Sequence, residues 1–116
     1  VVYHNCGDNA ARMTDSILRT GCAAYHFGNA VSMRDVLSKV PAGTVVMGNV
    51  DPAGQFRNGT PESVRQETLR IMEECCPENP GFIISSGCDI PPASSWENIR
   101  AFFQAVEEYY NAHGIR

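Results

Sequence analysis

The sequence lacks the features that mark several classes of protein. Its 116 residues include 9 Lys and Arg against 13 Asp and Glu, for a formal charge of −4. It therefore lacks the basic surface with which proteins bind nucleic acid. No apolar run approaches the roughly 20 residues that a membrane-spanning helix needs. Neither nucleic acid nor a membrane is an expected partner.

A disulfide framework is also missing. The sequence has five cysteines, an odd number, and Cys75 and Cys76 are adjacent, whereas disulfide frameworks usually have an even count. In a reducing compartment cysteines more often bind metal or act in catalysis. We therefore predict a cytoplasmic protein in which some cysteines serve such a role.

The start of the chain resembles the interior of a protein rather than its beginning. It opens on Val1, without a Met, and directly in an apolar run that is typical of a strand. We expect residues 1–116 to be a single piece of a longer protein.

Strand and helix patterns alternate along the chain. The predicted strands cover residues 1–3, 22–27, 44–47 and 82–85. Helices are predicted around residues 13–18, from 33 to about 39, from 61 to 76, and from 95 to about 110. Three start signals support them, namely Ser32 with Asp35, Thr60 before Pro61, and a capping box of Ser94 with Glu97.

Successive βα units imply parallel strands with right-handed crossovers. Two α/β architectures fit this order. One is the C-terminal part of a (β/α)₈ TIM barrel, with about four βα units, and the other is an open, doubly wound parallel sheet. A whole barrel takes roughly 250 residues, so the chain would supply about half of one. Both architectures place their functional sites at the carboxyl ends of the strands.

Three side chains at predicted strand ends are candidate metal ligands. His4 and Cys6 are two residues apart, which in an extended segment directs both side chains to the same face. Cys88 follows the fourth strand. An imidazole and two thiolates suit zinc, and three protein ligands leave a fourth position open, as in catalytic sites. The alternative is chance, because cysteines are often buried and a short motif has many false positives.

Other polar residues lie near the same strand ends. His26 is close to the end of the second strand, where it could orient a substrate or be a core histidine. Asn49 and Asp51 flank the end of the third strand, and turn chemistry alone would explain them. These three residues are our candidates for cofactor binding. Cys22, Cys75 and Cys76 are expected to be small apolar fillers.

Five motifs, in order, resemble one family. They are His-x-Cys-Gly (4–7), Gly-Asn-Val-Asp-Pro (48–52), Gly-Thr-Pro-Glu-Ser-Val (59–64), Gly-Phe-Ile-Ile-Ser-Ser-Gly-Cys-Asp-Ile-Pro (81–91) and Glu-Asn-Ile-Arg-Ala (97–101). The series is similar to the C-terminal part of the uroporphyrinogen decarboxylase superfamily, in particular its methylcobamide:thiol methyltransferase branch. Many members of this branch have an acidic residue where this chain has Gly28 and Asn29.

The resemblance implies a (β/α)₈ barrel in which His4, Cys6 and Cys88 bind zinc. It also implies an enzyme that passes a methyl group from a methyl-corrinoid, free or held by a corrinoid protein, to a small thiol such as coenzyme M. The piece alone is expected to be inactive and to self-associate, because half a barrel leaves sheet edges uncovered. Two alternatives stay open: a metal-free decarboxylase-like enzyme, and a non-catalytic fragment that binds zinc or a corrinoid protein.

Overall fold

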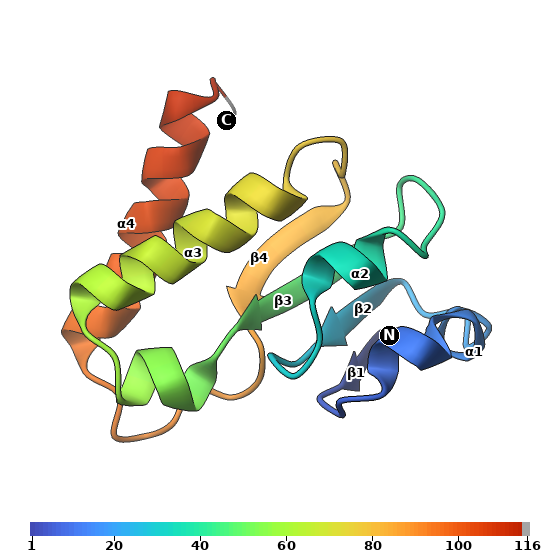
Figure 1. The fold of residues 1–116 in the computed structure, drawn as a ribbon, viewed down its shortest axis with the longest axis horizontal. Coiled ribbons are helices and arrows are strands. Elements are labelled where there is room, and N and C mark those ends of the chain that lie inside the picture. Colours follow the sequence, from blue (N-terminus) through green and yellow to red (C-terminus); the bar gives the residue numbers. More distant parts are fainter. Residues whose placement is uncertain (115–116) are drawn as a thin grey trace.

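The computed structural model describes residues 1–114 and contains one sheet of four parallel strands. The strands lie side by side in chain order, β1-β2-β3-β4 (Figure 1). Their bounds are Val2–Asn5 for β1, Ala24–Phe27 for β2, Val46–Val50 for β3 and Phe82–Ser86 for β4. The parallel pairing confirms the α/β class, and the sheet is open within the described residues.

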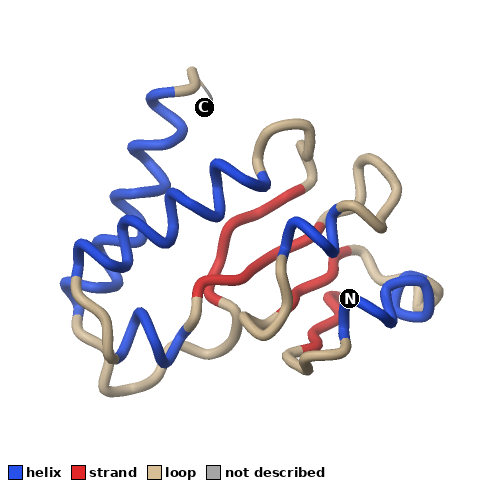
Figure 2. Tube along the Cα trace, in the orientation of Figure 1, coloured by secondary structure: helices blue, strands red, loops and turns tan. Residues whose placement is uncertain are grey.

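The helices alternate with the strands along the chain, as the pattern predicts, and Figure 2 shows the helices in blue beside the red strands. Their bounds are Ala10–Met13 for the short 3₁₀ helix η1, Thr14–Leu18 for α1, Met33–Leu37 for α2, Pro61–Cys75 for α3 and Trp96–Ala112 for α4. None of the helices within residues 1–114 is long and apolar enough to cross a membrane.

The third strand begins later than predicted. Thr44 still belongs to the preceding turn, since its N–H donates to the Pro41 carbonyl. Pairing with β4 begins at Val46, whose N–H donates to the Gly81 carbonyl. The strand then continues to Val50, and its last three residues are buried. Gly48, Asn49 and Val50, which we expected to follow the strand, therefore lie inside the sheet, whereas Asp51 and Pro52 lie beyond it.

A π-helical segment, η2, spans Pro52–Arg57 and directly follows Asp51. The Asp51 side chain accepts a hydrogen bond from the Gly54 N–H at 3.0 Å and so caps this segment. Phe56 is 1% exposed and packs on Phe102 of α4, with ring centroids 5.6 Å apart. The turn chemistry of Asp51 therefore starts a helical segment that joins the core.

Two of the three predicted helix starts are confirmed. Ser32 accepts from the Asp35 N–H, and Thr60 forms a reciprocal capping box with Ser63. The prediction for the last helix is wrong by one residue. Ser94 is held in a turn by its N–H bond to the Pro91 carbonyl, and Ser95 instead caps α4.

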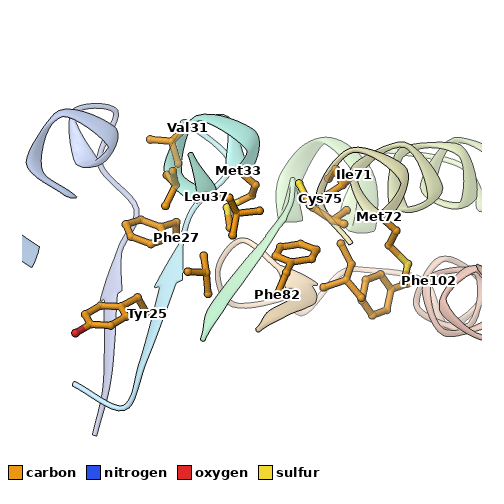
Figure 3. Packing of buried hydrophobic residues seen from close by; sticks show 14 of the residues in the cluster. Tyr25, Phe27, Val31, Met33, Leu37, Ile71, Met72, Cys75, Phe82 and Phe102 are labelled. Atoms are coloured by element: carbon orange, nitrogen blue, oxygen red, sulfur yellow. The ribbon is translucent and has the colours of Figure 1, made fainter. Parts of the chain in front are cut away.

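The hydrophobic core fills the space between one face of the sheet and the helices (Figure 3). Alternate strand residues, among them Phe27, Phe82 and Ile84, are directed to this core and are less than 9% exposed. Residues of the opposite parity lie on the other face, where Ile83 is 47% exposed. The helices therefore cover one face of the sheet, and the second face is open.

Candidate functional site

The parallel register places two histidines side by side. His4 on β1 and His26 on β2 are paired residues of the ladder, so their side chains lie on the same face. Their Nδ1 atoms are 3.0 Å apart, and the ring centroids are 4.7 Å apart. His4 is exposed and His26 half-buried. The sequence placed both residues near strand ends, and the register brings them into contact.

The end of β4 approaches β2 across the carboxyl end of β3. In a flat sheet, β1 and β4 would be roughly 14 Å apart, because two strands separate them. However, the Ser86 carbonyl oxygen at the end of β4 is 2.7 Å from His26 Nε2 on β2, across the intervening strand β3. Gly87 itself continues the β3–β4 ladder, since its N–H donates to the Val50 carbonyl at 2.8 Å. This approach brings the segment with Cys88 toward the histidine pair.

Two glycines allow this close approach. A Cβ atom at Gly28 would lie 2.8 Å from both Cα and Cβ of Cys6. A Cβ atom at Gly87 would lie 2.8 Å from the backbone nitrogen of Asn29 and 3.3 Å from Gly28. The loops after β1 and β4 thus both pack against the end of β2, and any larger residue would force them apart.

A small cavity of about 280 Å³ lies at this junction, and its lining consists of His4, His26, Cys88 and Asp89. Two of the three predicted zinc ligands therefore share one cavity, although they come from opposite edges of the sheet. Cys6 is exposed and lies outside this lining. Within residues 1–114, no three His, Cys, Asp or Glu side chains are grouped closely enough to hold a metal ion. The three-ligand site stays a prediction.

Asn49 and Asp51 line a different cavity, of about 260 Å³, between α2 and α3. The Asn49 side chain is 7% exposed and donates from Nδ2 to two backbone carbonyls, those of Gly28 at 3.0 Å and Val31 at 2.6 Å. Asp51 caps η2, as described above. The structure therefore separates these two residues from His26 and gives each of them a role in holding a loop.

The cysteines of α3 have the environment expected of apolar fillers. Cys75 is 1% exposed, and burial raises the pKa of its thiol to about 11. Burial also raises the pKa of Cys76. A raised pKa leaves little thiolate at neutral pH, so neither thiol is suited to metal binding or nucleophilic attack.

Sequence reasoning missed two polar features that shape the site and its support. The Ser86 carbonyl holds His26, with the Ser85 hydroxyl nearby, and a backbone oxygen gives no signal in a sequence. Asn98, in the first turn of α4, is 3% exposed and donates from Nδ2 to three carbonyls between residues 55 and 59. For the contact made by Asn98, the only signal in the sequence was a polar residue at a position of the amphipathic helix that faces the core.

Fold and site together define a βα-repeat protein whose polar groups gather at the carboxyl edge of a parallel sheet. The family model for uroporphyrinogen decarboxylase (URO-D) matches residues 1–109, and the chain belongs to this family. A uroporphyrinogen decarboxylase of Pseudoalteromonas translucida is 32% identical over 101 residues, which are 87% of this chain and 28% of that relative. One of Alcanivorax borkumensis is 29% identical, over 86% of this chain and 28% of that relative.

Among solved structures, a methyltransferase from Methanosarcina mazei superposes with a TM-score of 0.79. The two share 22% sequence identity, and the match covers 94% of this chain and 31% of that one. At 22% identity, this structural similarity shows that the two chains share a fold. The chain spans under a third of the length of the relatives that it matches.

Proposed function

We propose that this chain is the C-terminal part of a zinc-dependent methyltransferase that transfers a methyl group from a methyl-corrinoid to a small thiol such as coenzyme M. The observation that carries the proposal is the shared cavity of His4 and Cys88. These residues are 84 positions apart in sequence, His4 on the outer strand β1 and Cys88 just after the outer strand β4. Folding has thus brought together two residues that the motifs mark as ligands.

The proposed parent fold is a (β/α)₈ barrel, of which this chain supplies about four βα units. Its strands lie in sequential order with helices on one face, as in a segment of a barrel wall. In a doubly wound sheet, helices cover both faces. The open face, with Val2 56% exposed and Ile83 47% exposed, would then look into the barrel.

The donor set fits zinc. His4, Cys6 and Cys88 would hold the ion, since imidazole and thiolate are its preferred ligands. Bound zinc would supply the charge that keeps a substrate thiol deprotonated at neutral pH. The Gly28 and Gly87 backbones contribute by holding the β1 and β4 loops close together. Asp89 adds an acidic side chain to the cavity wall.

A metal-free decarboxylase is the second candidate. The relatives with 29 to 32% identity carry the name uroporphyrinogen decarboxylase, which favours this activity. Against it stands the composition of the cavity, because a thiol next to two imidazoles is a donor set that suits zinc. We therefore rank methyl transfer first.

An activity assay of the full-length protein distinguishes methyl transfer from decarboxylation. We expect it to demethylate methylcobalamin in the presence of coenzyme M, which is followed through the loss of the methyl–cobalt absorbance. A Cys88→Ser variant should lose this activity, while Cys22→Ser, which changes a half-buried cysteine outside the cavity, should retain it. Decarboxylation of uroporphyrinogen without methyl transfer would contradict the proposal and favour the second candidate.

The isolated chain is proposed to self-associate through its open sheet face and edges. Exposed apolar residues on that face, together with unpaired backbone groups of the edge strands β1 and β4, favour pairing with a second copy. Light scattering with size-exclusion chromatography should report a dimer or a larger species. A monomer at all concentrations would contradict this expectation.

A further inference from the structure

The hydrogen bond between the two histidines has a direction that a third atom determines. His4 Nδ1 and His26 Nδ1 are 3.0 Å apart, so one nitrogen donates and the other accepts. On the far side of the His26 ring, Nε2 is 2.7 Å from the Ser86 carbonyl oxygen, which can only accept. The proton of neutral His26 is therefore on Nε2, and its Nδ1 carries the lone pair.

The neighbouring serine agrees with this assignment. The Ser85 hydroxyl donates to the same Ser86 carbonyl at 3.0 Å and lies 3.2 Å from His26 Nε2. Since the hydroxyl proton is directed to the carbonyl, the hydroxyl oxygen faces Nε2 as a second acceptor. Both neighbours of His26 Nε2 thus favour a proton on that nitrogen.

Because His26 Nδ1 accepts the hydrogen bond, His26 determines which tautomer His4 adopts. In the neutral ring, His4 donates its Nδ1–H, so its Nε2 has no proton and carries a free lone pair. Within residues 1–114, His4 Nε2 makes no hydrogen bond, and the side chain is exposed in the cavity that contains Cys88. An unprotonated, unpaired imidazole nitrogen is the form that binds a metal ion.

We propose that His26 is a positioning residue, which holds His4 in the Nδ1–H tautomer and keeps His4 Nε2 available as a ligand. The chain of contacts runs from the Ser86 carbonyl through the His26 ring to the His4 ring. The identity of the ion as zinc rests on the function proposed above, whereas the tautomer does not. In known metal sites, such a partner of the non-ligating nitrogen orients the ring and sets its tautomer.

The tautomer can be measured directly on the metal-free chain. Long-range ¹H–¹⁵N NMR distinguishes protonated from unprotonated ring nitrogens, and a His26→Phe variant assigns the two rings. We expect a protonated Nδ1 and an unprotonated Nε2 in His4, and the reverse in His26. A His4 ring protonated on Nε2 would overturn the proposal, whatever the chain binds.

Zinc affinity gives a second, independent readout. His26→Phe keeps a ring but removes both nitrogens, and we expect it to weaken zinc binding roughly 10- to 100-fold. His26→Gln keeps one acceptor and one donor and should recover part of the loss. His113→Phe, which changes the histidine at the end of α4, is the control and should bind zinc as the wild type does.

The two readouts separate the possible failures. Equal zinc affinity in wild type and His26→Phe would overturn the positioning role. If the wild type binds no zinc but His4 is in the Nδ1–H tautomer, the positioning role stands and the zinc-dependent function falls. Should His26→Phe fail to fold, the wild-type spectrum, assigned with His26→Gln, still decides the tautomer.

Discussion

Replacing Asn49 should destabilise the loop that follows β2. Its side-chain amide donates to the carbonyls of Gly28 and Val31, at 3.0 and 2.6 Å, and is buried against them. Asn49→Ala removes both donors and leaves two buried carbonyls without partners. A buried polar group left unpaired costs about 1–3 kcal/mol, so we expect a loss of about 2–4 kcal/mol in the free energy of unfolding.

An Asn49→Asp variant separates hydrogen bonding from side-chain volume. The two side chains are almost the same size, but at neutral pH a carboxylate would face two carbonyl oxygens without a proton to donate. We expect a loss larger than that of Asn49→Ala by about 1 kcal/mol or more. Because this site disfavours the charged form, the folded-state pKa of the new carboxyl would be raised. The loss should therefore shrink as the pH falls through that pKa.

Urea denaturation followed by circular dichroism measures both variants, with the slope checked for a two-state transition. Asn29→Ala is the control, since Asn29 lies in the same loop but is exposed, and it should stay within about 0.5 kcal/mol of wild type. An Asn49→Ala variant as stable as the control, or an aspartate variant no worse than alanine, would refute the reasoning. Unchanged stability with lost activity of the full-length protein would assign Asn49 to cofactor binding instead.

Three further predictions concern α3 and α4. Asn98→Ala should cost about 2–4 kcal/mol in urea unfolding, because three carbonyls between residues 55 and 59 lose their shared donor. Arg70 lowers the pKa of Glu67 through a hydrogen bond, so this contact stabilises the fold above the ordinary carboxyl pKa and is lost as the pH falls. Glu67→Gln should therefore cost about 0.5 kcal/mol near pH 7 and almost nothing near pH 3, and equal losses at both would contradict this account. The pKa of the Cys75 thiol is raised from 9.0 to about 11, so its thiolate fraction should be roughly a hundredfold lower than that of an unperturbed cysteine. Iodoacetamide should therefore label Cys75 last among the cysteines of the folded chain, and mass spectrometry can check this order.

The order of strands and helices could be predicted because each element carries a local signal. Apolar runs marked the strands, and Ser32 and Thr60 marked two helix starts. The predicted element boundaries were wrong where a backbone hydrogen bond to a nearby residue sets the start of the strand or helix. Thr44 reads as strand by composition but is held in a turn by Pro41, and Ser94 is held in a turn by Pro91, so Ser95 caps the helix.

The candidate site could be predicted only in part, because its geometry depends on contacts between distant backbones. Sequence spacing placed His4, Cys6 and Cys88 at strand ends, but it could not show that the end of β4 approaches β2 across β3. That approach depends on the contact of His26 Nε2 with the Ser86 carbonyl and on the close packing of Gly87 against Gly28 and Asn29. The register of β1 with β2, which joins His4 to His26, has no local signal either.

The zinc content of the purified chain tests whether His4, Cys6 and Cys88 form a zinc site. The comparison is between the wild type, a His4→Ala, Cys6→Ser, Cys88→Ser triple variant, and a Cys22→Ser control, each reconstituted with zinc and freed of excess metal. We expect about one zinc per chain in the wild type and the control, and none in the triple variant. A folded wild type that binds no zinc, or a triple variant that retains it, would contradict the account.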